Sequence, residues 1–115
     1  MNTTTKDTLL NDGQELSSLL KTTKRMFVLF YASWCPHSLR FLPLFQQYAQ
    51  GTKNSCYRII IDEDEALCDK YAIDVYPTVL FFENGSVKKR LDGIPGAGLQ
   101  ERQLKEFLNQ CDIHP

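Results

Sequence analysis

Several features that would direct the chain to particular functions are missing from its sequence. Its net charge is only −1, so no electrostatic attraction to nucleic acid or to an anionic membrane is expected. No apolar run is as long as a membrane span, and the polar residues 1–7 lack the apolar core of a signal peptide. These absences predict a cytoplasmic protein with no nucleic-acid or membrane partner.

Patterns typical of metal and disulfide sites are missing too. The chain has two histidines and no Cys-x-x-Cys pair with which a zinc site could begin. Its four cysteines, Cys35, Cys56, Cys68 and Cys111, are spaced irregularly, which does not fit a disulfide-stapled scaffold. The acidic residues 62–65 lack the glycine and the ligand spacing of a calcium loop, and are expected to form a solvated turn and the charged N-terminus of the next helix. We therefore predict no metal and no cofactor.

Length and composition are those of one soluble globular domain. Hydrophobic residues make up 43% of the 115 residues and charged residues 23%, both typical values. This length allows one hydrophobic core but not two. We therefore expect a single domain over residues 1–115, monomeric, with residues 1–8 frayed or weakly paired.

The hydrophobic pattern predicts a parallel strand pair near the start. Residues 26–31 are a continuous apolar run, and residues 57–61 are apolar apart from Arg58; such runs are typical of strands covered on both faces. A helix is expected between them, over residues 35–48. A strand, a helix and a strand in this order form a βαβ unit, so the two strands should be parallel.

The second half of the chain should complete a mixed sheet. Asn84-Gly85 is a hairpin turn signal, and it separates strands expected at residues 78–82 and 86–91. This order of elements predicts an α/β fold, with a central mixed β-sheet and helices on both faces. Three further helices are expected. The first begins after a cap at Asn11 or Asp12 and ends at about residue 22. The others cover residues 65–71 and 99–111.

Three motifs occur in a characteristic order. Residues 30–38 read Phe-Tyr-Ala-Ser-Trp-Cys-Pro-His-Ser, residues 75–78 read Val-Tyr-Pro-Thr, and the hairpin turn is followed by Gly93. They resemble the aromatic-Ala-x-Trp-Cys-x-x-Cys site, the cis-proline loop and the hairpin of the thioredoxin superfamily, with serine replacing the second cysteine. Pro43 matches the proline that kinks the family's active-site helix. The resemblance covers about residues 9–110 and implies a thioredoxin fold.

The resemblance implies a thiol–disulfide oxidoreductase of cell redox homeostasis. Cys35 would begin a helix whose unpaired N–H groups favour the thiolate that attacks disulfides. His37, when protonated, would add to this effect. Protein disulfides are the implied substrates, and thioredoxin reductase or a low-molecular-weight thiol the implied reductant. The implied substrate-binding residues are Trp34, Pro36, Tyr76, Pro77 and Gly93.

Two residues depart from the family pattern. Ser38 occupies the position of the resolving cysteine, and its hydroxyl cannot form a disulfide. Leu29 occupies the position of the buried acid that, by resemblance, moves a proton to and from that cysteine. Cys35 would then start an exchange that an outside thiol, or another cysteine of the chain, must finish. Ser38 is either a natural monothiol feature or an engineered Cys→Ser change that traps partners.

The sequence is compatible with three kinds of function. The chain is either an enzyme or a binding module that captures client thiols and extended peptides without turnover, or it uses the fold as a redox-silent scaffold. The other three cysteines are interpreted as small buried hydrophobes. Cys68 is the first candidate for a remote resolving thiol, because its segment leads into the Pro77 loop.

Overall fold

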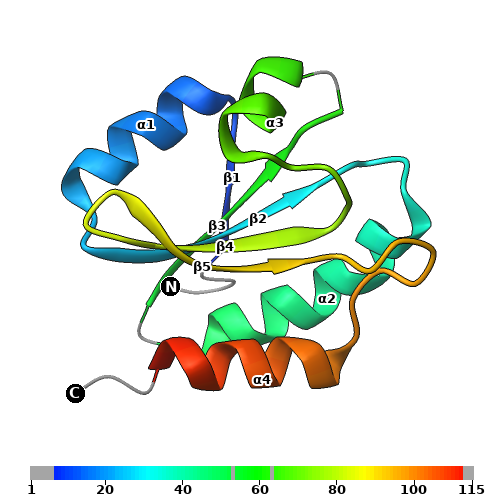
Figure 1. Cartoon of the computed structure of the whole chain (residues 1–115). Coiled ribbons are helices and arrows are strands. Elements are labelled where there is room, and N and C mark those ends of the chain that lie inside the picture. Colours follow the sequence, from blue (N-terminus) through cyan, green and yellow to red (C-terminus); the bar gives the residue numbers. More distant parts are fainter. Residues whose placement is uncertain (1–6, 53, 63, 113–115) are drawn as a thin grey trace.

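The computed structural model describes residues 7–52, 54–62 and 64–112. The described residues form five strands and four helices (Figure 1). They are β1 (Asp7–Leu10), α1 (Gly13–Thr22), β2 (Arg25–Tyr31), α2 (Pro36–Gly51), β3 (Ser55–Ile60), α3 (Glu65–Tyr71), β4 (Thr78–Glu83), β5 (Ser86–Asp92) and α4 (Glu101–Asp112).

One five-stranded sheet, in the order β1-β3-β2-β4-β5, forms the middle layer. β3 pairs in parallel with β1 and β2, whereas β4 runs antiparallel to both β2 and β5. Helices α1 and α3 cover one face, and α2 and α4 cover the other (Figure 1). The predicted α/β fold with a mixed sheet, and the predicted parallel strand pair, are therefore confirmed.

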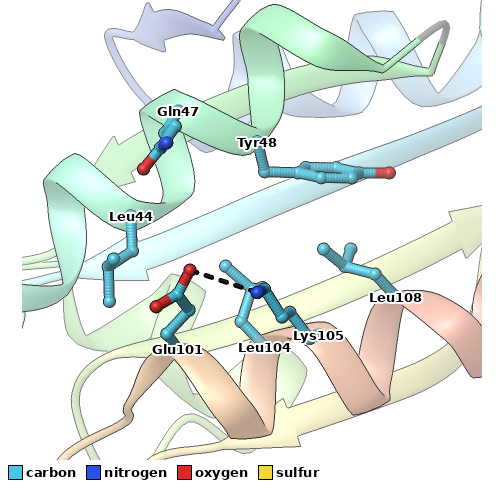
Figure 2. Close-up of a pocket in the computed structure, with 7 residues that line it drawn as sticks. All are labelled: Leu44, Gln47, Tyr48, Glu101, Leu104, Lys105 and Leu108. Carbon is cyan, nitrogen blue, oxygen red and sulfur yellow. Dashed lines mark ion pairs between the residues drawn. The ribbon is translucent and has the colours of Figure 1, made fainter.

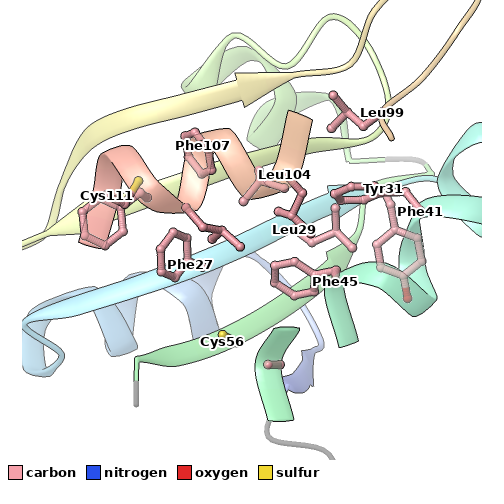
Figure 3. Close-up of a cluster of buried hydrophobic side chains, with 14 residues drawn as sticks. Phe27, Leu29, Tyr31, Phe41, Phe45, Cys56, Leu99, Leu104, Phe107 and Cys111 are labelled. Atoms are coloured by element: carbon pink, nitrogen blue, oxygen red, sulfur yellow. The ribbon is translucent and has the colours of Figure 1, made fainter. Parts of the chain in front are cut away.

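The central strand β2 supplies both halves of the hydrophobic core. Alternate side chains of a strand point to opposite faces of its sheet. Phe27, Leu29 and Tyr31 belong to the cluster beneath α2 and α4 (Figure 3), while Val28 and Phe30 belong to the cluster beneath α1 and α3. Six consecutive positions of β2, residues 26–31, are buried, which explains why this run shows no polar alternation.

The first described residues form a short strand at the edge of the sheet. Asp7 and Thr8, expected in a frayed or weakly paired start, begin strand β1, which pairs with β3 at the edge of the sheet. Residues 1–6 lie outside the described residues. A four-residue edge strand carries too few side chains for a period of two to be recognised, so this pairing depends on the β3 edge rather than on local sequence.

The C-terminal end of α3 is held by two devices. Ala72 ends the helix in the left-handed conformation (φ 54°), and its N–H reaches the carbonyls of Asp69 and Cys68. The Arg90 guanidinium of β5 donates to the carbonyls of Tyr71 (3.0 Å) and Ala72 (2.9 Å). These bonds satisfy carbonyls that the helix itself leaves unpaired.

We expect Ala72→Gly to stabilise the protein by about 0.5–1 kcal/mol, because glycine adopts this conformation without a Cβ penalty. The side chain of Ala72 is exposed, so its loss removes no core contact. The matched control is Ala66→Gly, in the body of the same helix, which should destabilise by about 1 kcal/mol. Urea unfolding of both variants measures the difference. Equal losses of stability in the two variants would contradict this account of the helix end.

Candidate active site

Cys35 lies between the end of β2 and the beginning of α2. It is the N-cap residue of α2, and its side chain is 7% exposed. Pro36 follows at the first helical position, where the missing N–H costs no hydrogen bond. Within the described residues no side-chain capping hydrogen bond is made to this helix end. Such a terminus stabilises negative charge.

Ser38 lies one turn into α2 and is completely buried, with 0% exposure. Its hydroxyl oxygen accepts a hydrogen bond from the Ala32 N–H at 3.3 Å. The serine therefore ties the helix to the end of β2. This contact uses the position from which a second cysteine would attack a disulfide on Cys35.

The loop that contains Pro77 packs against Gly93. The Tyr76–Pro77 peptide bond is cis, and the Thr78 hydroxyl donates to the Val75 carbonyl at 2.9 Å. A Cβ on Gly93 would lie 2.7 Å from the Pro77 carbonyl oxygen, closer than real Cβ contacts allow. Glycine is required there because two backbone segments meet.

An aromatic surface flanks the same loop. Trp34 is 64% exposed, and its ring meets Tyr76 edge-on with a centroid distance of 5.9 Å. Burial raises the pKa of the Tyr76 hydroxyl, and the charges of Cys68, Asp62 and Cys35 raise it further. The structure thus brings together Trp34, Cys35 and Tyr76, which the sequence proposed as parts of one site.

Asp62 is a structural contact that the sequence interpretation missed. Its carboxylate accepts from the Ser33 N–H at 2.8 Å and also from the Ser33 hydroxyl. Asp62 lies in the expected exposed turn, and Asp64 caps α3 as the expected helix N-terminal charge. The unexpected feature is that Asp62 also anchors the loop two residues before Cys35. Nothing in the local sequence indicates a contact between residues 29 positions apart. It follows from the parallel pairing of β2 and β3.

Cys68 lies on α3, on the side of the sheet opposite α2, and is half-buried. Its thiol interacts electrostatically with the Tyr76 hydroxyl. Burial raises the pKa of the Cys68 thiol, the charges of Asp64 and Asp69 raise it further, and the interaction with Tyr76 opposes the shift. No disulfide joins the four cysteines, all of which lie in the described part of the chain. The role of Cys68 as a resolving thiol stays a prediction.

Cys56, Cys111 and Leu29 lie in the hydrophobic cluster beneath α2 and α4 (Figure 3). All three are at least nine-tenths buried. Leu29 therefore fills core volume at the position where the resemblance placed an acid.

His37 faces a cavity rather than the aromatic surface. Its Nδ1 lies 2.8 Å from a terminal nitrogen of Arg40. Because a guanidinium only donates, Nδ1 accepts this bond. His37 and Arg40 both line a cavity of about 600 Å³ that the loop before α4 closes on its other side.

A smaller cavity, of about 280 Å³, lies farther along the groove between α2 and α4 (Figure 2). Its lining is mainly leucine and tyrosine, with an ion pair between Glu101 and Lys105 at 3.4 Å. No cysteine lines it. Within the described residues no cluster of His, Cys, Asp or Glu side chains could hold a metal ion, and no helix is long and apolar enough to span a bilayer.

Known thioredoxins resemble this chain in sequence and in fold. Thioredoxin of Mycoplasmoides gallisepticum is 35% identical over 101 residues, which cover 86% of this chain and 96% of that protein. Thioredoxin-1 of Caenorhabditis elegans is 32% identical over 82 residues, covering 70% of this chain and 71% of the relative. The solved thioredoxin of Plasmodium falciparum shares the fold, with a TM-score of 0.79 and 23% identity over 90% of this chain and 97% of that one. The Thioredoxin family model matches residues 8–110, and the chain therefore belongs to the thioredoxin family of oxidoreductases.

Proposed function

We propose that the chain is a monothiol oxidoreductase in which Cys35 attacks protein disulfides. The Cys35 thiolate would form a bond to one sulfur of the partner disulfide, and the other sulfur would leave as a thiolate. The product is a mixed disulfide between Cys35 and the partner. The observation that carries this proposal is the position of Cys35 as the N-cap residue of α2, at a helix end whose dipole favours negative charge.

The surface around Cys35 suits an extended partner chain. Exposed Trp34 offers an apolar platform, and the backbone at Tyr76, beside Pro77, offers groups with which an extended chain can pair. Gly93 lets its own backbone pack directly against the Pro77 loop, because a Cβ there would meet the Pro77 carbonyl oxygen, and this packing supports the loop from below. Pro36 sets the backbone at the start of α2, and His37 lies at the edge of the same site.

Ser38 determines how the reaction must end. Its buried hydroxyl is bound to the backbone and cannot displace the partner from Cys35. A second thiol must therefore finish the reaction. Because Cys68 lies on the side of the sheet opposite α2, we propose that this thiol comes from outside, either from a small thiol or from a reductase protein. We propose on these grounds a single-domain protein whose cycle depends on an external reductant.

The first prediction concerns the mixed disulfide. Incubating the protein with a peptide disulfide should give an adduct on Cys35 that persists after the free peptide is removed, since no internal thiol resolves it. Peptide mass spectrometry identifies the modified cysteine. Cys35→Ser should form no such adduct, whereas Cys111→Ser, which changes a core cysteine, should form it as the parent does. An adduct retained in Cys35→Ser would contradict the assignment of the nucleophile.

The second prediction restores the missing thiol. Ser38→Cys should reduce insulin in the presence of dithiothreitol at least about tenfold faster than the parent, because an intramolecular attack replaces a bimolecular one. Ser38→Ala, which removes the same hydroxyl without adding sulfur, is the matched control and should stay at the parental rate. Equal rates in both variants would show that the site is built for capture of partners without turnover.

A further inference from the structure

The cavity beside His37 lies next to the proposed reaction centre. Its walls are α2, through His37 and Arg40, and the loop between β5 and α4, through Gly96 and Ala97. At about 600 Å³ it is within the size range of small-molecule sites. It begins two residues after Cys35, on the side of α2 that faces this loop.

The loop that closes the cavity is held close to α2. Gly98 has a φ of 73°, and a Cβ there would lie 2.7 Å from the Cβ of His37. Ile94 and Gly98 exchange backbone hydrogen bonds of 2.9 and 2.8 Å, which close the loop on itself. The cavity wall thus has a defined shape, and it depends on glycine at the point of contact.

Arg40 supplies the positive charge of this cavity. One of its terminal nitrogens is bound to His37, which leaves other N–H groups of the guanidinium to bind a ligand. Across the described residues, no carboxylate forms an ion pair with Arg40. A guanidinium suits a carboxylate in particular, because two parallel N–H groups match two oxygens.

Glu101 is the anionic group of the same cavity. It is paired with Lys105, and it lies where this cavity meets the smaller one shown in Figure 2, since Leu44 and Glu101 line both. Its charge would repel a ligand with a second carboxylate at that end. The charge pattern therefore suits a ligand with a single carboxylate, bound at Arg40.

We propose that this cavity binds a small thiol carrying one carboxylate, and that this thiol resolves the mixed disulfide on Cys35. The inference rests on the function proposed above, and it names the external reductant that Ser38 makes necessary. Arg40 would act as a binding residue for the carboxylate, while the sulfur of the ligand points back toward the first turn of α2.

The reaction balances in two exchanges. The thiolate of the small thiol attacks the Cys35 sulfur, forms a disulfide with it, and releases the partner as its thiolate. A second molecule of the small thiol then attacks the small-thiol sulfur of that disulfide. This step releases the Cys35 thiolate and the disulfide of the small thiol. The net change is reduction of one partner disulfide by two small thiols, which are oxidised to one disulfide.

The test uses two dipeptide thiols that differ only in one charge, Cys-Gly and Cys-Gly amide. Cys35 is first allowed to react with dipyridyl disulfide, which leaves a pyridylthio group on its sulfur and releases one pyridine-2-thione. Mass spectrometry verifies the site. Release of pyridine-2-thione is then followed by absorbance. The quantity compared is the rate with Cys-Gly divided by the rate with Cys-Gly amide. This ratio, divided by the corresponding ratio for free dipyridyl disulfide, should be about five, as expected for one partly exposed charge-assisted contact.

Matched variants assign this preference to the cavity. Arg40→Gln should abolish it, giving a ratio near that of the free disulfide. Arg102→Gln removes the same charge from the exposed face of α4, outside the cavity, and should keep the preference. Loss of the preference in both variants, or in neither, would overturn the inference, because the effect would then be one of net charge or of another site.

The outcomes also separate this inference from the proposed function. If Cys35 does not accept the pyridyl group, the proposed nucleophile is wrong and the inference falls with it. If Cys35 loads normally but the two dipeptides react at equal normalised rates, the oxidoreductase proposal stands and the thiol-binding cavity is refuted.

Discussion

Burial of β2 on both faces is the constraint on which the rest of the structure depends. Phe27 and Leu29 face α2 and α4, whereas Val28 and Phe30 face α1 and α3, so one strand holds both hydrophobic clusters together. Its hydrogen bonds join the parallel and antiparallel halves of the sheet. The chain leaves the end of this rigid strand and turns directly into α2. Cys35 at that turn is therefore fixed by the most buried part of the protein.

The surroundings of Cys35 come from segments that are far apart in sequence. Asp62 follows β3 and holds Ser33, Tyr76 precedes β4 and meets Trp34, and Gly93 follows β5 and admits the Pro77 loop. Each segment adjoins a strand at the same end of the sheet, either just after it or, for Tyr76, just before it. The site is thus a consequence of strand order, with short polar contacts setting the details.

Ser38 and Leu29 depart from the family pattern, and both fit the packing around the candidate site. Ser38 keeps a buried hydrogen bond to the strand, and Leu29 keeps a buried position in the core. Both substitutions fit their surroundings, since neither leaves a charged group without a partner in the interior. The outside reductant that we propose would bind in the cavity at Arg40, where the chain presents a cation close to the proposed nucleophile.

The sequence by itself determined the fold class, the central strands, the hairpin and the candidate residues around Cys35. Long apolar runs and a turn dipeptide are local signals that survive in any tertiary context. Tertiary structure alone decided the β1 edge pairing, the Asp62–Ser33 anchor, the link between Cys68 and Tyr76, and the cavity between Arg40 and the Gly98 loop. These features join residues distant in sequence, and their geometry exists only after β2 and its neighbours have set the register and the helices have packed on the sheet.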